Sequence, residues 1–195
     1  MNITNYGTVY GRHYIIPDLI TKNSLVYSFG IGEDISFDLA LIENTGCKVY
    51  AFDPTPKSLA WIKQQKLPEG FQFFEYGLSD KDGTLTFEPP PNPNWVSYKE
   101  SEKGTIVLPV KCLSTIKAEL GHVNKQIDFL KLDIEGSEFS VINDILANNL
   151  HPVQMSVGFH GTDTYIADWL RANRHLQERY HAYLYSDNEI FFISK

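Results

Sequence analysis

The chain alternates between short apolar runs and longer stretches in which apolar residues recur every three or four positions. Short apolar runs bounded by turn residues predict buried strands, and the longer periodic stretches predict amphipathic helices. An aromatic lead-in, broken by two glycines, predicts a hairpin before Pro17, and a tyrosine-rich tail predicts a second hairpin around Asp187 and Asn188. The expected strands between the two hairpins are residues 25–29, 48–52, 71–76, 84–87, 105–110, 127–132 and 153–159.

The expected helices follow four of these strands. Residues 35–43 should end near Gly46, and Thr55 with Pro56 should open a second helix that Pro68–Gly70 terminates. The third should run from Ser137 to about Asn148 and the fourth from Thr162 and Asp163 to about Arg179. Strands that alternate with helices and end in a hairpin predict a parallel α/β sheet with an antiparallel edge. We expect one domain over residues 1–195, with 1–24 as a lead-in segment.

Composition narrows the class of protein. Of 195 residues, 43% are hydrophobic, which is enough for a core and argues against a disordered chain. The net charge of −7 argues against nucleic-acid binding as the main role, because phosphates are bound by positively charged surfaces. Two cysteines, no recognisable leader at the start and no apolar run long enough for a bilayer predict a cytoplasmic protein without a membrane span.

The first candidate ligand contact is the glycine pair after the first core strand. Gly30 and Gly32 would let the backbone approach a ligand closely. The G-x-G-x-x-G pattern of nicotinamide sites is incomplete, because its third glycine is Ile35 here. Glu33 and Asp34 at the helix start would also repel a pyrophosphate. A cationic cofactor without phosphate, such as S-adenosylmethionine, suits these residues better; the alternative is an ordinary tight turn.

Two further strand ends could complete an adenosine site. Asp53 ends the second core strand, where an ionised carboxylate can accept hydrogen bonds from both hydroxyls of a ribose. The alternative for Asp53 is a cap of the turn before Pro54. Gly77, Leu78 and Ser79 follow the third strand, where they could cover an adenine or form a plain turn.

The block from Lys131 to Glu138 combines charge with a strand end. Lys131, Asp133 and Glu135 should lie on one side of the extended chain, at the floor of a cleft, and His160 ends the next strand. Acids and a histidine at a cleft floor can orient an ammonium group or accept a proton, so the candidate catalytic residues are His160, Asp133 and Glu135. Such a set could also hold Mg²⁺. A structural role remains the alternative for His160.

These segments, in this order, resemble the FkbM-type methyltransferases, which use S-adenosylmethionine and mostly methylate hydroxyls of sugars or natural products. The resemblance spans roughly residues 25–146 and is most specific in the lysine-aspartate-glutamate-glycine-glutamate block. It implies the class I methyltransferase (Rossmann-like) three-layer sandwich, with a seven-stranded, mostly parallel sheet and a C-terminal antiparallel hairpin. The implied cofactor contacts are Gly30, Gly32, Glu33, Asp53, Pro54, Gly77, Leu78, Ser79 and Asp133.

One departure and two rival hypotheses accompany the resemblance. The family often carries an acid two residues before the first glycine, where this chain has Ser28, so the ammonium-binding role would pass to Glu33 or Asp133. A catalytically degenerate cofactor-binding or scaffold protein and a nicotinamide-dependent enzyme are the rivals. The expected partner is a small-molecule or glycan acceptor, not a nucleic acid. The sequence predicts no particular oligomeric state.

Overall fold

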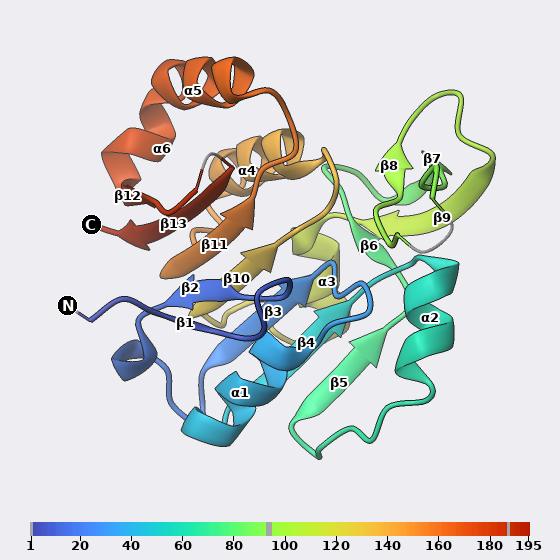
Figure 1. Cartoon of the computed structure of the whole chain (residues 1–195). Coiled ribbons are helices and arrows are strands. Elements are labelled where there is room, and N and C mark those ends of the chain that lie inside the picture. Colours follow the sequence, from blue (N-terminus) through green and yellow to red (C-terminus); the bar gives the residue numbers. More distant parts are fainter. Residues whose placement is uncertain (1, 93–94, 187) are drawn as a thin grey trace.

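The computed structural model describes residues 2–92, 95–186 and 188–195, which form a seven-stranded sheet with helices on both faces (Figure 1). The strand order is β12-β13-β11-β10-β3-β4-β5. Five neighbouring strands are parallel, and the last two form an antiparallel hairpin whose strand β13 pairs antiparallel with β11. The strands are β3 (Leu25–Phe29), β4 (Lys48–Phe52), β5 (Phe71–Phe74), β10 (Phe129–Leu132), β11 (Gln154–Gly158), β12 (Tyr180–Leu184) and β13 (Glu189–Ser194).

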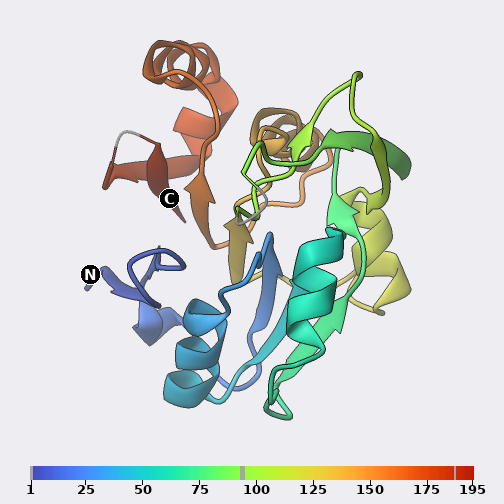
Figure 2. The ribbon, with the colours of Figure 1, turned by 45° about the vertical axis from the view of Figure 1, so that its right-hand side comes forward.

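Two apolar clusters cover the two faces of this sheet, because side chains of one strand alternate between them. Val26 and Phe129 face a cluster that includes helices α1 and α2, whereas Tyr27 and Leu130 face one built with α3 to α6. Figure 2 shows α1 and α2 on one side of the strands and α3 and α4 on the other. The helices are α1 (Ser36–Thr45), α2 (Pro56–Ile62), α3 (Leu113–Glu119), α4 (Glu138–Ala147), α5 (Asp163–Ala172) and α6 (Arg174–Arg179).

The local signals predict all four of the expected helices, but two of them end earlier than expected. Gly46 adopts a left-handed conformation with φ of 70° and ends α1, as predicted. The helix expected from Asp163 to Arg179 is instead two helices, because the Asn173 side chain accepts the amide hydrogen of Leu176 and starts α6. Helix α2 begins at Pro56 as expected but ends at Ile62, before the proline that was expected to end it. Helix α3 was not predicted.

A second sheet of four strands was also not predicted. Residues 77–78, 84–87 and 105–110, read as a turn, a short return strand and a further strand, belong to this separate sheet, with order β6-β9-β7-β8. It lies near the carboxyl ends of the central strands (Figure 1). Pro93, part of the proline-rich loop that precedes β8, lies outside the described residues. The strands are β6 (Gly77–Leu78), β7 (Gly83–Glu88), β8 (Lys99–Glu100) and β9 (Ile106–Lys111).

The lead-in segment forms the expected hairpin, with β1 (Thr4–Tyr6) antiparallel to β2 (His13–Ile15), followed by the short 3-10 helix η1 (Pro17–Leu19). The apolar side chains of β2 and of the residue after it join the cluster on the α1 side of the sheet. The tail hairpin is formed by β12 and β13; Asp187 at its turn lies outside the described residues. Among the helices of the described part of the chain, none combines the length and apolar character needed to cross a bilayer.

Candidate active site

A pocket of about 180 Å³ opens at the carboxyl ends of β3, β4 and β10. Chain order reverses there, since the chain passes from β3 outward to β4 and β5 and later adds β10 on the other side of β3. Ligands of open α/β sheets bind at this kind of crevice. The lining residues include Tyr10, Gly11, Phe29, Gly30, Ile31, Gly32, Glu33, Asp34, Phe52, Asp53, Pro54, Thr55, Gly77, Leu78, Phe87, Val96, Tyr98, Val110, Lys131, Asp133, Ile134, Glu135 and Ser137.

The glycine turn after β3 is one wall of the pocket. Gly30 has a φ of 76°, and a Cβ there would lie 1.8 Å from the carbonyl oxygen of Asp133. This contact makes any side chain impossible without moving the strand end of β10. The turn therefore depends on glycine at position 30 for close packing against β10 as well as for its dihedral angles.

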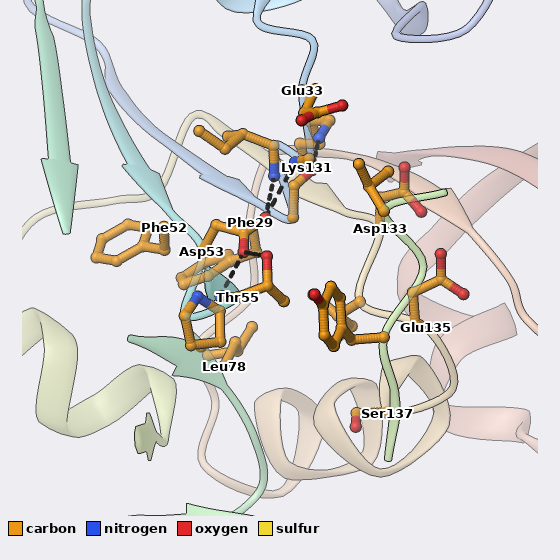
Figure 3. A pocket seen from close by; sticks show the side chains of 18 of the residues that line it. Phe29, Glu33, Phe52, Asp53, Thr55, Leu78, Lys131, Asp133, Glu135 and Ser137 are labelled. Carbon is orange, nitrogen blue, oxygen red and sulfur yellow. Dashed lines mark hydrogen bonds between the residues drawn. The ribbon is translucent and has the colours of Figure 1, made fainter. Parts of the chain in front are cut away.

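Asp53 holds the same turn from the side of β4. Its Oδ2 accepts the amide hydrogens of Ile31 (3.1 Å) and Gly32 (3.0 Å). Its Oδ1 accepts from the Thr55 amide (2.9 Å) and the Thr55 hydroxyl (2.6 Å) (Figure 3). A carboxylate offers about four lone-pair sites. The side chain expected to bind a ribose is thus 4% exposed and already well supplied with protein donors.

The other predicted cofactor contacts divide into those that line the pocket and one that does not. Pro54, Gly77 and Leu78 line it. Glu33 also lines it, with its carboxylate 3.7 Å from Lys57 Nζ. Ser79 is not among the lining residues: it is 2% exposed and its hydroxyl donates to Asp80 at 3.1 Å. The backbone of Ser79 pairs instead with β9, because its amide donates a hydrogen bond to the Lys111 carbonyl (3.0 Å).

Across the pocket from Asp53 lies a cluster of acids around one histidine (Figure 3 shows Asp133 and Glu135 on that side). His160 Nε2 lies 3.7 Å from Asp133 Oδ1 and 3.5 Å from Glu135 Oε2. Its Nδ1 lies 2.9 Å from Oε1 of Glu138, a fully buried carboxylate that also accepts the backbone amides of Ile134 and Gly136. Glu138 therefore orients the imidazole, and the three predicted catalytic residues come together from the turn after β10 and the segment after β11.

Two pKa values in this cluster are raised, for different reasons. Burial by itself would lower the pKa of His160, but the hydrogen bond to Glu138 and the charges of the three carboxylates outweigh it and raise that pKa to about 9. Burial also raises the pKa of Glu135, against smaller opposing effects from Ser97 and His160. His160 is therefore a cation at neutral pH, and Glu135 is a stronger base than an exposed glutamate.

The same geometry bears on metal binding. One ligand atom each from Asp133, Glu135 and His160 lies within 4.8 Å of the other two, so the set could hold a metal ion. The expectation of Mg²⁺ stays a prediction.

Sequence reasoning did not assign several pocket residues to the site. Tyr10 and Gly11 arrive from the loop between β1 and β2, and Val96 arrives from the loop before β8. No local pattern marks these residues, because distant segments meet only in the folded chain. Lys131 is different, since it was expected at the floor of the cleft with Asp133 and Glu135, and it does line the pocket. It is 3% exposed and donates a hydrogen bond to the Gly30 carbonyl.

Comparison with known sequences finds partial relatives. The chain is 26% identical to "Probable methyltransferase-like protein 24" of Homo sapiens over 139 residues, which is 71% of this chain and 32% of that protein. It is 30% identical to the hexuronic acid methyltransferase AglP of Haloferax volcanii over 121 residues, 60% of this chain and 49% of that protein. The chain thus spans about a third to a half of the length of these relatives.

Comparison of structures finds the same fold at low sequence identity. The methyltransferase FkbM from Methylobacillus flagellatus matches with a TM-score of 0.55 and 14% identity, over 89% of this chain and 44% of that one. SMU.1697c from Streptococcus mutans, solved in complex with SAH, matches with a TM-score of 0.51 and 14% identity, over 92% and 93%. The methyltransferase FkbM domain matches residues 26–183, most of the sheet and every strand end that borders the pocket, and the chain belongs to this methyltransferase family.

Proposed function

We propose that this protein transfers a methyl group from S-adenosylmethionine to a hydroxyl of a sugar, glycan or natural product. The observation that carries the proposal is that Gly30, Asp53 and Asp133, from three different strand ends, border one pocket. Family membership supports methyl transfer, and the SAH held by a structural neighbour supports the cofactor class.

The two sides of the pocket match the two parts of such a cofactor. Leu78, Val110 and Phe52 supply apolar contact for an adenine ring. Asp133 and Glu135 supply negative charge on the opposite side, where an ammonium and a sulfonium are stabilised. When bound, the cofactor would supply an electrophilic methyl group.

We assign the proton transfer to Glu135 and not to His160. A hydroxyl becomes a good nucleophile only as its proton is removed, and a base with a pKa nearer neutrality does this best. Glu135 lines the pocket and its pKa is raised by burial. His160, already protonated, would hold the carboxylates of Glu135 and Asp133 in place.

The acceptor is proposed from chemistry and relatives together. AglP is a hexuronic acid methyltransferase, so a carbohydrate acceptor is consistent with the family. Tyr10 and Tyr98 line the pocket, and aromatic rings of this kind can pack against a sugar face.

The decisive experiment has two stages. Calorimetry with S-adenosylhomocysteine and with NAD should show micromolar binding of the first and none of the second. Incubation with methyl-labelled S-adenosylmethionine and a pool of glycans and small hydroxylated metabolites should then label an acceptor. Absence of S-adenosylhomocysteine binding at millimolar concentration refutes the proposal.

A cofactor-binding scaffold without catalysis is the second candidate. It is favoured by Ser28, a buried hydroxyl at the position, two residues before Gly30, where the family often carries an acid. Binding without methyl transfer to any acceptor would favour this candidate.

A further inference from the structure

A row of polar side chains crosses the buried centre of the sheet below the glycine turn. Lys131 on β10 stands beside Ser28 on β3 and Ser156 on β11 in the strand register. All three are at most 3% exposed. They share the face of Val26 and Phe129, which packs against helix α1. A polar row at this depth needs a specific reason, because burial of unpaired polar groups is costly.

The lysine of this row connects the core to the pocket. Its ammonium donates a hydrogen bond to the Gly30 carbonyl, the first peptide of the glycine turn. The turn thus has two anchors: Asp53 accepts the amides of Ile31 and Gly32, and Lys131 donates to the carbonyl that precedes them. A buried ammonium is stable only beside a compensating negative charge.

Asp38 is the buried acid that can supply this charge. It lies on α1, is 0% exposed, and neither of its oxygens makes a hydrogen bond within the described residues. Burial raises the pKa of Asp38, and the nearby Lys131 ammonium opposes that rise. The Ser28 hydroxyl also lies close enough to favour the charged carboxylate, although outside hydrogen-bonding geometry.

Two other ionisable groups lie near Lys131, namely Asp34 and His13; Asp34 is charged, but it is only partly buried and lies at the edge of the pocket. Asp34 accepts hydrogen bonds from the Thr8 hydroxyl and the Ser36 amide. His13 bonds the Ser156 hydroxyl through Nδ1 (3.1 Å), and burial holds its pKa well below the usual range, so it carries no charge at neutral pH. Asp38 is thus the fully buried carboxylate near Lys131, and its oxygens make no hydrogen bond within the described residues.

We propose that Asp38 is the buried counter-charge of Lys131 and that this pair positions the Gly30 carbonyl, so that the glycine turn is held in the form that receives the cofactor. Both are positioning residues, since Asp38 acts through Lys131 and Lys131 acts through the backbone of the turn. The inference rests on the proposed function in one respect, namely that the ligand of the turn is an adenosyl cofactor.

The test moves the buried carboxylate from position 38 on α1 to position 28 on β3, beside Lys131. Asp38→Asn should weaken S-adenosylhomocysteine binding about tenfold or more, a loss of about 1.4 kcal/mol. Ser28→Asp combined with Asp38→Ser returns an acid to the strand position opposite Lys131, and should restore the dissociation constant to within about threefold of wild type. Calorimetry below the unfolding temperature of each variant gives these constants.

Two variants in the same helix are the controls. Glu43→Gln changes the charge equally at an exposed position, and Leu41→Ala opens the buried apolar face of α1 without touching the pair. Glu43→Gln should bind as wild type does, and Leu41→Ala should lower the unfolding temperature with little change in affinity. Unchanged affinity in Asp38→Asn, or an equal loss in Leu41→Ala, overturns the inference.

A measurement without ligand separates this inference from the proposed function. The amides of Gly30, Ile31 and Gly32 are all hydrogen-bonded, so their hydrogen exchange reports the turn directly. They should exchange about tenfold faster in Asp38→Asn than in Leu41→Ala and return to the wild-type rate in the double variant. If the wild type ignores S-adenosylhomocysteine, the proposed function fails, and the exchange rates alone decide the inference. If Asp38→Asn does not fold but the double variant does, the inference is supported; if neither folds, it is overturned.

Discussion

The two sides of the pocket are built on opposite principles. On the side of β3 and β4, Asp53 and the glycine turn form a closed hydrogen-bonded unit in which donors and acceptors come from the protein itself. On the side of β10 and β11, three carboxylates share one imidazole; Glu138 is fully buried, whereas His160, Asp133 and Glu135 are partly exposed. The first arrangement resists change in shape, and the second responds to protons and ligands. In the proposed enzyme, Asp53 and the glycine turn (the rigid wall) therefore fix the shape of the pocket. Asp133, Glu135 and His160 (the charged wall) supply the groups that transfer protons and bind charge.

The strongest challenge to the rigid wall is Gly30→Ala. The added Cβ would meet the Asp133 carbonyl at 1.8 Å, so the two walls must separate, and we expect cofactor binding to be lost. Gly121→Ala is the matched control, since Gly121 has a similar φ of 70° but nothing within 4 Å of the added atom. It should cost about 1–2 kcal/mol of stability and leave affinity unchanged. Calorimetry and thermal unfolding of both variants would show whether the close contact or the positive φ makes glycine necessary at position 30.

Glu135→Gln tests the proposed role of the charged wall in proton transfer. Loss of the base should lower kcat by about 10²–10⁴-fold while the S-adenosylhomocysteine dissociation constant changes little, because the amide keeps the size of the side chain. Single-turnover methyl transfer is the measurement. An equally large loss in His160→Gln with full activity in Glu135→Gln would reassign the base to the histidine.

Asp53→Ala separates a cap from a ribose ligand. It removes the acceptor of the Ile31 and Gly32 amides, each costing about 1–3 kcal/mol when buried and unpaired, so the cofactor-free protein should unfold at a lower temperature. Asp82→Ala is a suitable control, because Asp82 likewise accepts an amide (Cys112, 2.8 Å) and a hydroxyl (Thr115, 2.7 Å) but is not among the pocket residues. It should alter stability without altering affinity. Weakened binding in Asp53→Ala with an unchanged unfolding temperature would support the ribose role instead.

The smallest expected effect is a pH dependence of stability from the charged wall. The pKa of His160 is raised from 6.5 to about 9, so the folded state binds its proton more tightly than the unfolded chain does. This stabilisation is complete below pH 6.5 and is lost as pH rises towards 9, by about 1–3 kcal/mol.

Thermal unfolding at pH 6 and pH 9 measures this loss. His160→Gln should show a smaller decrease than wild type, whereas His175→Gln should match wild type, because His175 is 83% exposed beside Glu178. Parallel pH profiles of wild type and His160→Gln would contradict the assignment of charge to His160.

Much of the fold could be predicted locally, and the exceptions have physical causes. Gly46 and Pro56 mark helix ends because their backbone preferences act wherever they stand. Helix α5 was extended too far because apolar periodicity continues past Asn173, whose side chain interrupts the helix through a hydrogen bond. The second sheet was missed because pairing between β7 and β9 joins segments separated by a proline-rich loop, and strand partners are not encoded by periodicity.

Some residues of the candidate site could also be predicted from the sequence, whereas others required the structure. Asp133, Glu135 and His160 could be predicted together, since parallel strands end at one edge of a sheet. Ser79 could not be excluded, because its pairing with β9 depends on the second sheet. The shifted pKa values of His160 and Glu135 also required the structure, since a pKa depends on burial and on the distances to neighbouring charges such as Glu138 and Asp133.

By itself the amino-acid sequence determined the alternation of strands and helices, the glycine turn and the family, because these depend on backbone preferences and on residues adjacent in the chain. Only the tertiary structure decided that Asp53 holds the turn, that Lys131 reaches Gly30 and that Asp38 lies buried on the same face of the sheet. Those relations depend on distances between segments far apart in sequence, and electrostatic and hydrogen-bond energies are functions of distance and burial.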